Sequence, residues 1–375
     1  MSRPWSRRDV AVSLSGAALL SSIGGPRAEG REAAAPAVVR FKDLTGQEIA
    51  LAAPARRIVD LWTVGAAFAV AAHGSASRLV AINDRAHSML KRGLVGRLFP
   101  EILELPSDIL GGAGAPNVER LVSLNPDLVV DFRAGGRQAS AVMRNAGLTV
   151  ASYERHPGGI GATIKALLFM FGEMIGDTSR AERIAAVLDE TVAPLRAFAS
   201  APHDARPSAL IVMPTSHGFY ASGGGASSEF ADLIYSAGGS NAAAKLPGHS
   251  LVSPEQIAAW DPDVMLLFQS DGVHPRQILD HAVLGGIKAA VSRRVYVLPI
   301  GANNWGSIGP DEFLAQVWLG ELLHPDKSAT TLRADMRKAY EAIFGRTLAE
   351  TVIDGVLRKD LNGGSAGYAR FLRGA

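Results

Sequence analysis

The sequence of 375 residues lacks cysteine altogether. Without cysteine there is no disulfide bond, no thiol nucleophile and no lipid-modified cysteine at the start of a mature chain. No stretch reaches the roughly 18 uninterrupted apolar residues that a transmembrane helix requires. These absences predict a soluble protein that is not lipid-anchored.

The usual signatures of catalysis are also missing. The sequence contains neither a P-loop nor a G-x-S-x-G nucleophile elbow, and its nine histidines include no His-x-His or His-x-x-x-His pair. We therefore expect a protein that is not an enzyme and has no catalytic residue, cofactor or metal site. The glycine-rich stretch 222–228 is compatible with an anion-binding turn ahead of a helix or with a flexible loop.

The net charge of +2 comes from the first 28 residues, which hold four arginines and one aspartate. The rest of the chain is close to neutral, so its composition does not favour a nucleic-acid partner. Arg7 and Arg8 precede an apolar run that is typical of a signal peptide. We expect a twin-arginine signal over residues 1–28, with cleavage as late as 37, and export to the periplasm. A buried N-terminal helix is disfavoured, because paired arginines are rare in a core.

After residue 38, short β-rich runs alternate with helical stretches. This alternation predicts an α/β fold with mostly parallel sheets covered by helices. Because the chain is longer than one core usually organises, we expect two Rossmann-like lobes, over residues 38–175 and 201–345, and a C-terminal helical tail over 346–375. A long helix over 176–200 is predicted to join the lobes, and Pro194 should kink it or end it early.

One element of the sequence occurs twice. Residues 117–132, NVERLVSLNPDLVVDF, align without a gap with residues 253–268, SPEQIAAWDPDVMLLF. Each copy predicts a helix that ends before a proline and is followed by a buried strand. Glu119 and Glu255 occupy matching positions in the first helical turn, where a glutamate is favoured by the helix dipole.

A cleft is expected between two such lobes, and ligands of open parallel sheets bind at the carboxyl ends of the strands. Polar and aromatic residues that follow predicted strands are therefore candidate ligand contacts. These residues are Trp62, Arg85, Arg133, Tyr220, Asn304 and Trp305. For each of them, ordinary packing or a solvated position is the alternative.

Several segments together resemble a known family. They are RRIVDLW at 56–62, ERLVSLNPDLVV at 119–130, SPEQIAAWDPDVMLL at 253–267, GGIKAAVSRRVYVLP at 285–299 and GPDEFLAQVWLGELLHPD at 309–326. Over about residues 38–345 the chain resembles the periplasmic substrate-binding proteins of ATP-driven importers for iron–siderophores, haem, cobalamin and, in some members, molybdate or tungstate. The resemblance implies two Rossmann-like lobes joined by one long helix.

The resemblance also implies a partner for the repeated glutamates. In that family a glutamate on each lobe pairs with arginines of the membrane permease, and Glu119 and Glu255 match those positions. It implies a monomeric periplasmic protein that delivers its ligand to an ABC permease dimer in the inner membrane with its ATPase.

The ligand that the resemblance implies is a metal chelate, foremost a ferric siderophore-type iron complex. Molybdate or tungstate, cobalamin and haem stay open. Tryptophan and tyrosine faces would suit a flat chelate, and Arg85 and Arg133 would neutralise its anionic groups. An enzyme or chelatase on a similar scaffold is the rival function, and a subunit that feeds a sensor is a third.

Overall fold

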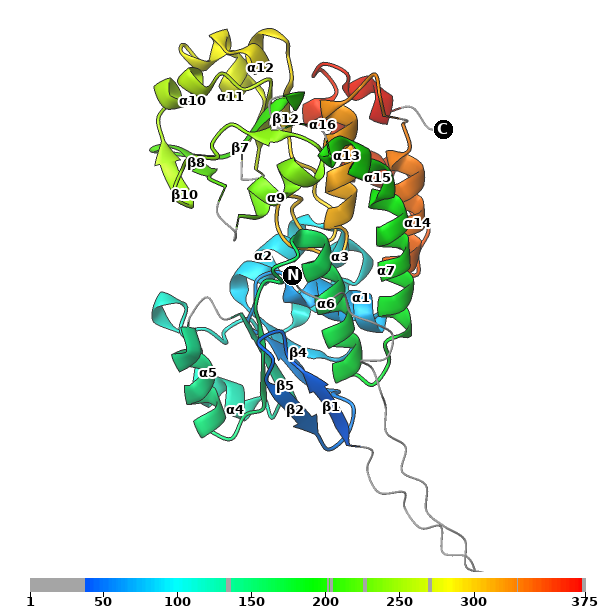
Figure 1. Ribbon diagram of the computed structural model, residues 1–375. Coiled ribbons are helices and arrows are strands. Elements are labelled where there is room, and N and C mark those ends of the chain that lie inside the picture. Colours follow the sequence, from blue (N-terminus) through cyan, green and yellow to red (C-terminus); the bar gives the residue numbers. More distant parts are fainter. Residues whose placement is uncertain are drawn as a thin grey trace, which may run out of the picture. The chain divides into compact units, whose positions relative to one another are not determined.

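A computed structural model describes residues 38–132, 136–200, 202, 205–224, 228–268, 272–328 and 330–372. Residues 37–375 form one structural unit, whose elements are labelled in Figure 1. The predicted export signal lies outside the described residues. Within those ranges, no helix is long and apolar enough to cross a bilayer.

The first lobe contains a hairpin and a parallel sheet. In the hairpin, β1 (Val39–Lys42) and β2 (Glu48–Leu51) pair antiparallel. The sheet has the strand order β4-β3-β5-β6, and all of its pairs are parallel. Its strands are β3 (Ile58–Asp60), β4 (Leu79–Ile82), β5 (Leu128–Phe132) and β6 (Val150–Tyr153). Nearly every side chain of these strands is buried, as expected for parallel strands covered on both faces.

Helices connect these strands. They are α1 (Gly65–His73), α2 (Asp84–Arg92), α3 (Leu94–Leu98), α4 (Val118–Ser123) and α5 (Gly136–Asn145), with short 3-10 turns at η1 (Pro100–Glu104) and η2 (Gly112–Gly114). Helix α1 is apolar all round, and eight of its residues, from Gly65 to Ala72, are buried. A helix with this composition belongs in a protein interior.

The second lobe contains a mixed sheet. Its strands are β7 (Ser208–Thr215), β8 (Gly218–Ser222), β9 (Ser240–Asn241), β10 (His249–Val252), β11 (Val264–Leu267) and β12 (Val295–Val297). Strands β9, β7, β11 and β12 run parallel and repeat the order of β4, β3, β5 and β6. Strands β8 and β10 add antiparallel pairs. The predicted parallel arrangement therefore holds for the whole of the first sheet. In the second sheet it holds for β9, β7, β11 and β12 only.

The helices of the second lobe continue into the C-terminal tail. They are α9 (Glu229–Ser236), α10 (Pro254–Trp260), α11 (Arg276–Leu279), η6 (Leu284–Gly286), α12 (Lys288–Val291), α13 (Glu312–Leu323), α14 (Leu332–Phe344), α15 (Glu350–Val356), α16 (Lys359–Asn362) and η7 (Tyr368–Phe371). The tail binds β12: the Asn362 side chain exchanges two hydrogen bonds with Val297, and Ser365 Oγ donates to Val295 O. These contacts make the tail part of the second lobe.

The helical connection between the lobes is divided. The single helix predicted over 176–200 is observed as α7 (Ser179–Val192), a 3-10 turn η4 (Ala193–Leu195) and α8 (Arg196–Ala199), and α6 (Ile160–Met174) precedes them. Pro194 lies in the 3-10 turn, so the prediction that it ends the helix early is confirmed. Helix α7 is therefore about 21 Å long, shorter than the predicted segment.

The repeated sequence element folds in the same way in both lobes. The Asn117 side chain accepts a hydrogen bond from Arg120 N and caps α4, while Ser253 accepts one from Gln256 N and caps α10. After each helix one residue adopts the left-handed conformation, Asn125 with φ 45° and Asp261 with φ 42°. The prediction of a helix, a proline turn and a buried strand is confirmed in both copies.

An aspartate in each copy ties two strands together. Asp127 Oδ2 accepts hydrogen bonds from Arg56 N and Arg57 N at 2.7 and 2.9 Å, just before β3. Asp263 Oδ2 accepts one from Ser208 N at 2.8 Å, at the start of β7. Strand β3 pairs with β5, which follows Asp127, and β7 pairs with β11, which follows Asp263. The duplication therefore fixes the amino ends of the central strand pair in each lobe.

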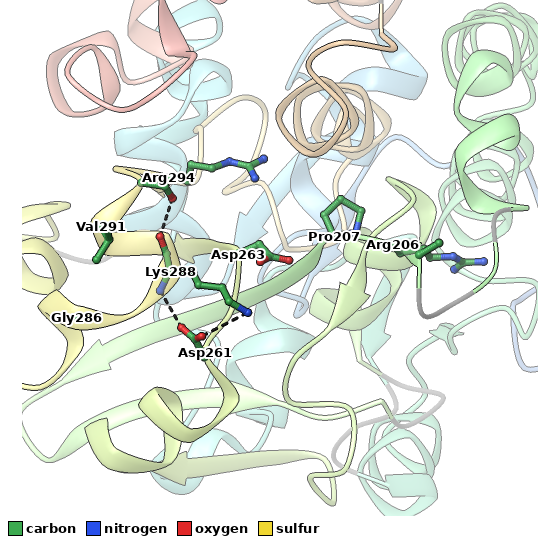
Figure 2. Close-up of a pocket in the computed structure, with 10 residues that line it drawn as sticks. Arg206, Pro207, Asp261, Asp263, Gly286, Lys288, Val291 and Arg294 are labelled. Carbon is green, nitrogen blue, oxygen red and sulfur yellow. Dashed lines mark hydrogen bonds and ion pairs between the residues drawn. The ribbon is translucent and has the colours of Figure 1, made fainter.

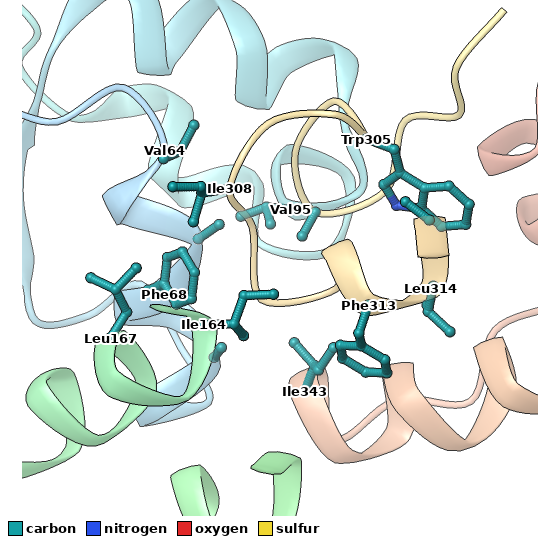
Figure 3. Close-up of a cluster of buried hydrophobic side chains, with 14 of the residues drawn as sticks. Val64, Phe68, Val95, Ile164, Leu167, Trp305, Ile308, Phe313, Leu314 and Ile343 are labelled. Atoms are coloured by element: carbon teal, nitrogen blue, oxygen red, sulfur yellow. The ribbon is translucent and has the colours of Figure 1, made fainter. Parts of the chain in front are cut away.

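One hydrophobic cluster spans both lobes. Figure 3 shows part of it, with side chains from α1, α3 and α6 beside the segment 305–308 and helices α13 and α14. The labelled members are Val64, Phe68, Val95, Ile164, Leu167, Trp305, Ile308, Phe313, Leu314 and Ile343. Because this cluster is shared, a large separation of the lobes would expose buried apolar surface.

Candidate functional site

The carboxyl ends of the two sheets meet between the lobes. After β12, the Asn303 side chain donates a hydrogen bond to Val64 O, which follows β3, at 3.4 Å. Leu94 N donates to Gly301 O at 2.8 Å. The geometry agrees with the rule that ligand sites of open α/β sheets lie at the carboxyl ends of strands.

An arginine at this junction is paired with two carboxylates of the other lobe. Arg155 follows β6, and its Nη2 forms an ion pair with Asp232 Oδ2. Its Nη1 lies 3.7 Å from Glu229 Oε1. Both acids belong to the first turn of α9, whose N-cap Ser228 accepts a hydrogen bond from Ala231 N. The positive end of the α9 dipole favours negative charge at this position.

Tyr153, which interacts electrostatically with Arg155, belongs to a stack of aromatic rings. The ring of Tyr153 stacks on Trp62 and Phe132 with centroids 4.2 and 5.0 Å apart. The Tyr153 hydroxyl is buried and has no hydrogen-bond partner among the described residues. Burial raises the pKa of Tyr153 above its ordinary value of 10, and the nearby charge of Glu229 raises it further. The hydroxyl therefore stays protonated and is available as a donor.

The segment that follows β12 is fixed by two buried acids at the start of α13. Both Glu312 oxygens accept from Gly306 N, at 2.9 and 3.1 Å. Asp311 Oδ2 accepts from Trp305 Nε1 at 3.2 Å and from the Tyr340 hydroxyl at 2.9 Å. Burial raises the pKa of both carboxyl groups. These bonds hold the segment rigidly beside the lobe junction.

The predicted ligand contacts that the structure describes differ in burial. Trp62 is buried in the aromatic stack. Asn304 is buried too, and its Oδ1 has no hydrogen-bond partner in the described part of the chain. Trp305 is fully buried in the shared core, and its indole N–H donates a hydrogen bond to Asp311 Oδ2. Arg85 and Tyr220 are exposed and lie outside the stacked group. Arg133 lies outside the described residues.

The repeated glutamates are both exposed in the first turns of their helices. In Figure 1, α4 and α10 lie on the side of the unit away from α7 and α14. A hydrogen bond from the Ser253 hydroxyl lowers the pKa of Glu255, and its own backbone N–H lowers it further. Glu255 is therefore charged at neutral pH.

Four residues of the lobe junction were not among the predicted contacts: Tyr153, Arg155, Glu229 and Asp232. The strand-end rule applied to the segment 148–154 would have found Tyr153 and Arg155. Tyr153 is the last residue of β6, and Arg155 lies two residues further on. The two acids carry no comparable sequence signal, since they lie on a helix whose facing partner is remote in the chain.

A pocket lies elsewhere on the second lobe. Figure 2 shows it at the amino ends of β7, β11 and β12, which begin after Pro207, Asp263 and Arg294. Its Asp261 accepts a hydrogen bond from Lys288 N at 2.8 Å and forms an ion pair with Lys288 Nζ. This pocket is open and lies at the strand ends opposite to those that meet at the lobe junction. Across the described ranges, no three His, Asp or Glu side chains are grouped to hold a metal ion.

Two α/β lobes whose strand ends meet at a charged and aromatic junction define a two-lobed ligand-binding protein. The chain belongs to the periplasmic binding protein family, whose model matches residues 109–300, about half of the chain. The predicted family and fold class are thereby confirmed.

Known proteins share this fold. A periplasmic solute binding protein from Veillonella parvula superposes with a TM-score of 0.77 at 22% identity, over 88% of this chain and 99% of that one. The molybdate-bound MolA of Haemophilus influenzae gives 0.70 at 19% identity, over 83% and 99%. A nickel–histidine complex of Helicobacter pylori CeuE gives 0.68 at 21%, over 86% and 99%.

A match by sequence covers a shorter stretch. The molybdate-binding protein MolA of Haemophilus influenzae is 31% identical over 107 residues, which span 28% of this chain and 30% of the length of MolA. The segment is therefore less than a third of either protein.

Proposed function

We propose that this protein captures a small metal complex between its lobes in the periplasm and delivers it to an ABC permease dimer with its ATPase, without covalent chemistry. Family membership and the charged, aromatic lobe junction support this function. A ferric siderophore-type complex is the leading ligand, and molybdate, tungstate or cobalamin are the alternatives. The similarity to molybdate-binding MolA supports the oxyanion alternative.

The lobes proposed to close on the ligand are residues 38–175 and 201–345, with the segment 176–200 between them. Because one hydrophobic cluster spans both lobes, we infer that closure is a small movement. We further infer that the protein works as a monomer and reaches the periplasm by the twin-arginine route, with residues 1–28 as the signal.

The single observation that carries the proposed delivery step is the pair Glu119 and Glu255. Each lies exposed in the first turn of a duplicated helix, one on each lobe. The cap oxygens of the two helices come from Asn117 and Ser253. We infer that they form one ionic contact per permease subunit, an arrangement that suits a two-fold partner.

Charge reversal tests this delivery step. The double variant Glu119→Arg, Glu255→Arg should keep the ligand affinity of the parent protein and abolish uptake into vesicles that contain the permease and ATPase. The double variant Glu101→Arg, Glu104→Arg is the matched control. It reverses two glutamates as well, but both lie outside the repeated element. Uptake that survives the double reversal at parental rates would show that the two glutamates are not docking contacts.

The ligand itself is identified by native mass spectrometry of protein taken from the periplasm. A thermal-shift panel of ferric chelates, haem, cobalamin and molybdate follows, because a ligand of the folded state raises the melting temperature by mass action.

A further inference from the structure

The charge of Arg155 is already matched twice inside the protein. Each terminal nitrogen of its guanidinium faces one carboxylate of α9, Nη2 that of Asp232 and Nη1 that of Glu229. The Arg155 side chain is only 12% exposed, while the two acids are 29% and 26% exposed. The arginine lies on the first lobe and the acids on the second, so this contact joins the lobes directly.

Two donors at this position have unused hydrogen-bonding capacity. The Tyr153 hydroxyl and Arg155 Nη1 are buried, and neither has a hydrogen-bond partner among the described residues. A buried donor without an acceptor is unfavourable, so an oxygen group that reached both would be bound well. Tyr153 and Arg155 are two residues apart at the end of β6 and interact electrostatically.

The acids can leave Arg155 without becoming buried, unpaired charges. They are partly exposed and lie in the first turn of α9, where the helix dipole stabilises a carboxylate. Arg155 is much less exposed, so once they leave it needs another anion. The contact is therefore suited to exchange one anionic partner for another.

We propose that Glu229 and Asp232 act as an internal competitor for Arg155, so that a ligand binds by presenting anionic oxygen atoms to Arg155 and Tyr153 and displacing the two carboxylates. This inference rests on the proposed function and names the ligand class for that site. The ligand carries carboxylate, hydroxamate, catecholate or oxyanion oxygens. The rings of Trp62 and Phe132 stack on the ring of Tyr153, whose hydroxyl would meet these oxygens. Asp232 and Glu229 then set affinity and exclude ligands too weakly charged to displace them.

The test uses the full chain and two defined anionic probes, sodium molybdate and ferric citrate, with hexaamminecobalt(III) as a cationic probe. Binding is measured by isothermal titration calorimetry. Asp232→Asn should bind at least one anionic probe about tenfold more tightly than the parent protein, because a partly buried ion pair no longer competes. Glu229→Gln should act in the same direction by a smaller factor, since its contact is longer.

A double-mutant cycle separates competition for Arg155 from a general change of charge. In an Arg155→Gln background, anionic probes should bind more weakly than to the parent protein, and adding Asp232→Asn should then leave affinity unchanged. Asp189→Asn is the matched control, because Asp189 pairs with Lys165 at 2.9 Å on the surface of α6 and α7. This control should bind both anionic probes as the parent protein does.

Three outcomes would overturn the proposal. The first is weaker anion binding by Asp232→Asn, and the second is an equal gain with and without Arg155. The third is tight hexaamminecobalt(III) binding that Asp232→Asn removes, which would make the acids themselves the ligand contacts. If neither the parent nor Asp232→Asn binds an anionic probe, the ligand class fails, whereas the delivery function is judged separately by the Glu119 and Glu255 reversal.

Discussion

Asp60 gives a sharp prediction about the pH dependence of stability. It ends β3 and is fully buried, and its Oδ1 accepts a hydrogen bond from Trp62 N at 3.0 Å. Its Oδ2 has no hydrogen-bond partner in the described part of the chain. Burial raises the pKa of Asp60 from 3.8 to about 8. The backbone amides of Trp62 and Ala66 lower the pKa, but by less than burial raises it. The folded protein therefore keeps this carboxyl protonated at neutral pH.

The direction and size of the effect follow from proton linkage. Between about pH 5 and pH 7 the unfolded chain has lost the Asp60 proton and the folded protein retains it, so raising the pH favours unfolding. One such proton lowers the free energy of unfolding by about 1.4 kcal/mol per pH unit. Stability from this group is complete below the unfolded pKa of 3.8 and is lost as pH rises toward the folded value of about 8.

The variant Asp60→Asn removes this proton while its side-chain oxygen can still accept from Trp62 N. Between about pH 5 and pH 7, we expect the unfolding free energy of the variant to fall less steeply with pH than that of the parent protein. The two slopes should differ by about 1.4 kcal/mol per pH unit. Urea unfolding followed by tryptophan fluorescence at several pH values measures the slope. Asp326→Asn, at an exposed aspartate, should keep the parental slope. If Asp60→Asn also kept the parental slope, Asp60 would have to be ionised in the folded protein.

Two further predictions concern the stability of the lobes. Asp127→Ala removes the acceptor of two backbone hydrogen bonds and should lower the unfolding free energy by about 2 kcal/mol, whereas Asp263→Ala, which removes the acceptor of one, should cost about half as much. Equal losses in urea unfolding would contradict this reasoning. Gly223→Ala would place a Cβ atom 1.9 Å from the carbonyl oxygen of Leu246 and should lower the melting temperature strongly, while Gly112→Ala, with open space around it, should not. Similar melting temperatures for both variants would argue against the close approach.

The duplicated element shows how far local sequence signals reach. Asn117 and Ser253 are cap residues in any context, and proline stops each helix, so both copies could be predicted residue by residue. Pro194 likewise ends α7, because a proline ring is not tolerated in the interior of an α-helix. The antiparallel strands β8 and β10 escaped prediction, because strand direction depends on which edge of the sheet receives the chain.

The aromatic residues show where sequence reasoning stops. Trp62 and Trp305 both follow strands, and the sequence treats them alike as candidate contacts. Only the fold places Trp62 in a stack with Tyr153 and Trp305 in the shared core, where its indole N–H donates to Asp311. Composition and periodicity report whether a residue is suited to burial, and they do not report which partner it meets.

By itself, the sequence determined the α/β class, the duplicated helix and strand, and the exposed glutamate in each copy, because caps, proline and hydrophobic period act within one turn or one strand. The tertiary structure alone decided that Arg155 meets Glu229 and Asp232. Those residues lie more than 70 positions apart, and their contact depends on how the two lobes pack. Ionic pairing across lobes acts through space, so no local pattern in the chain encodes it.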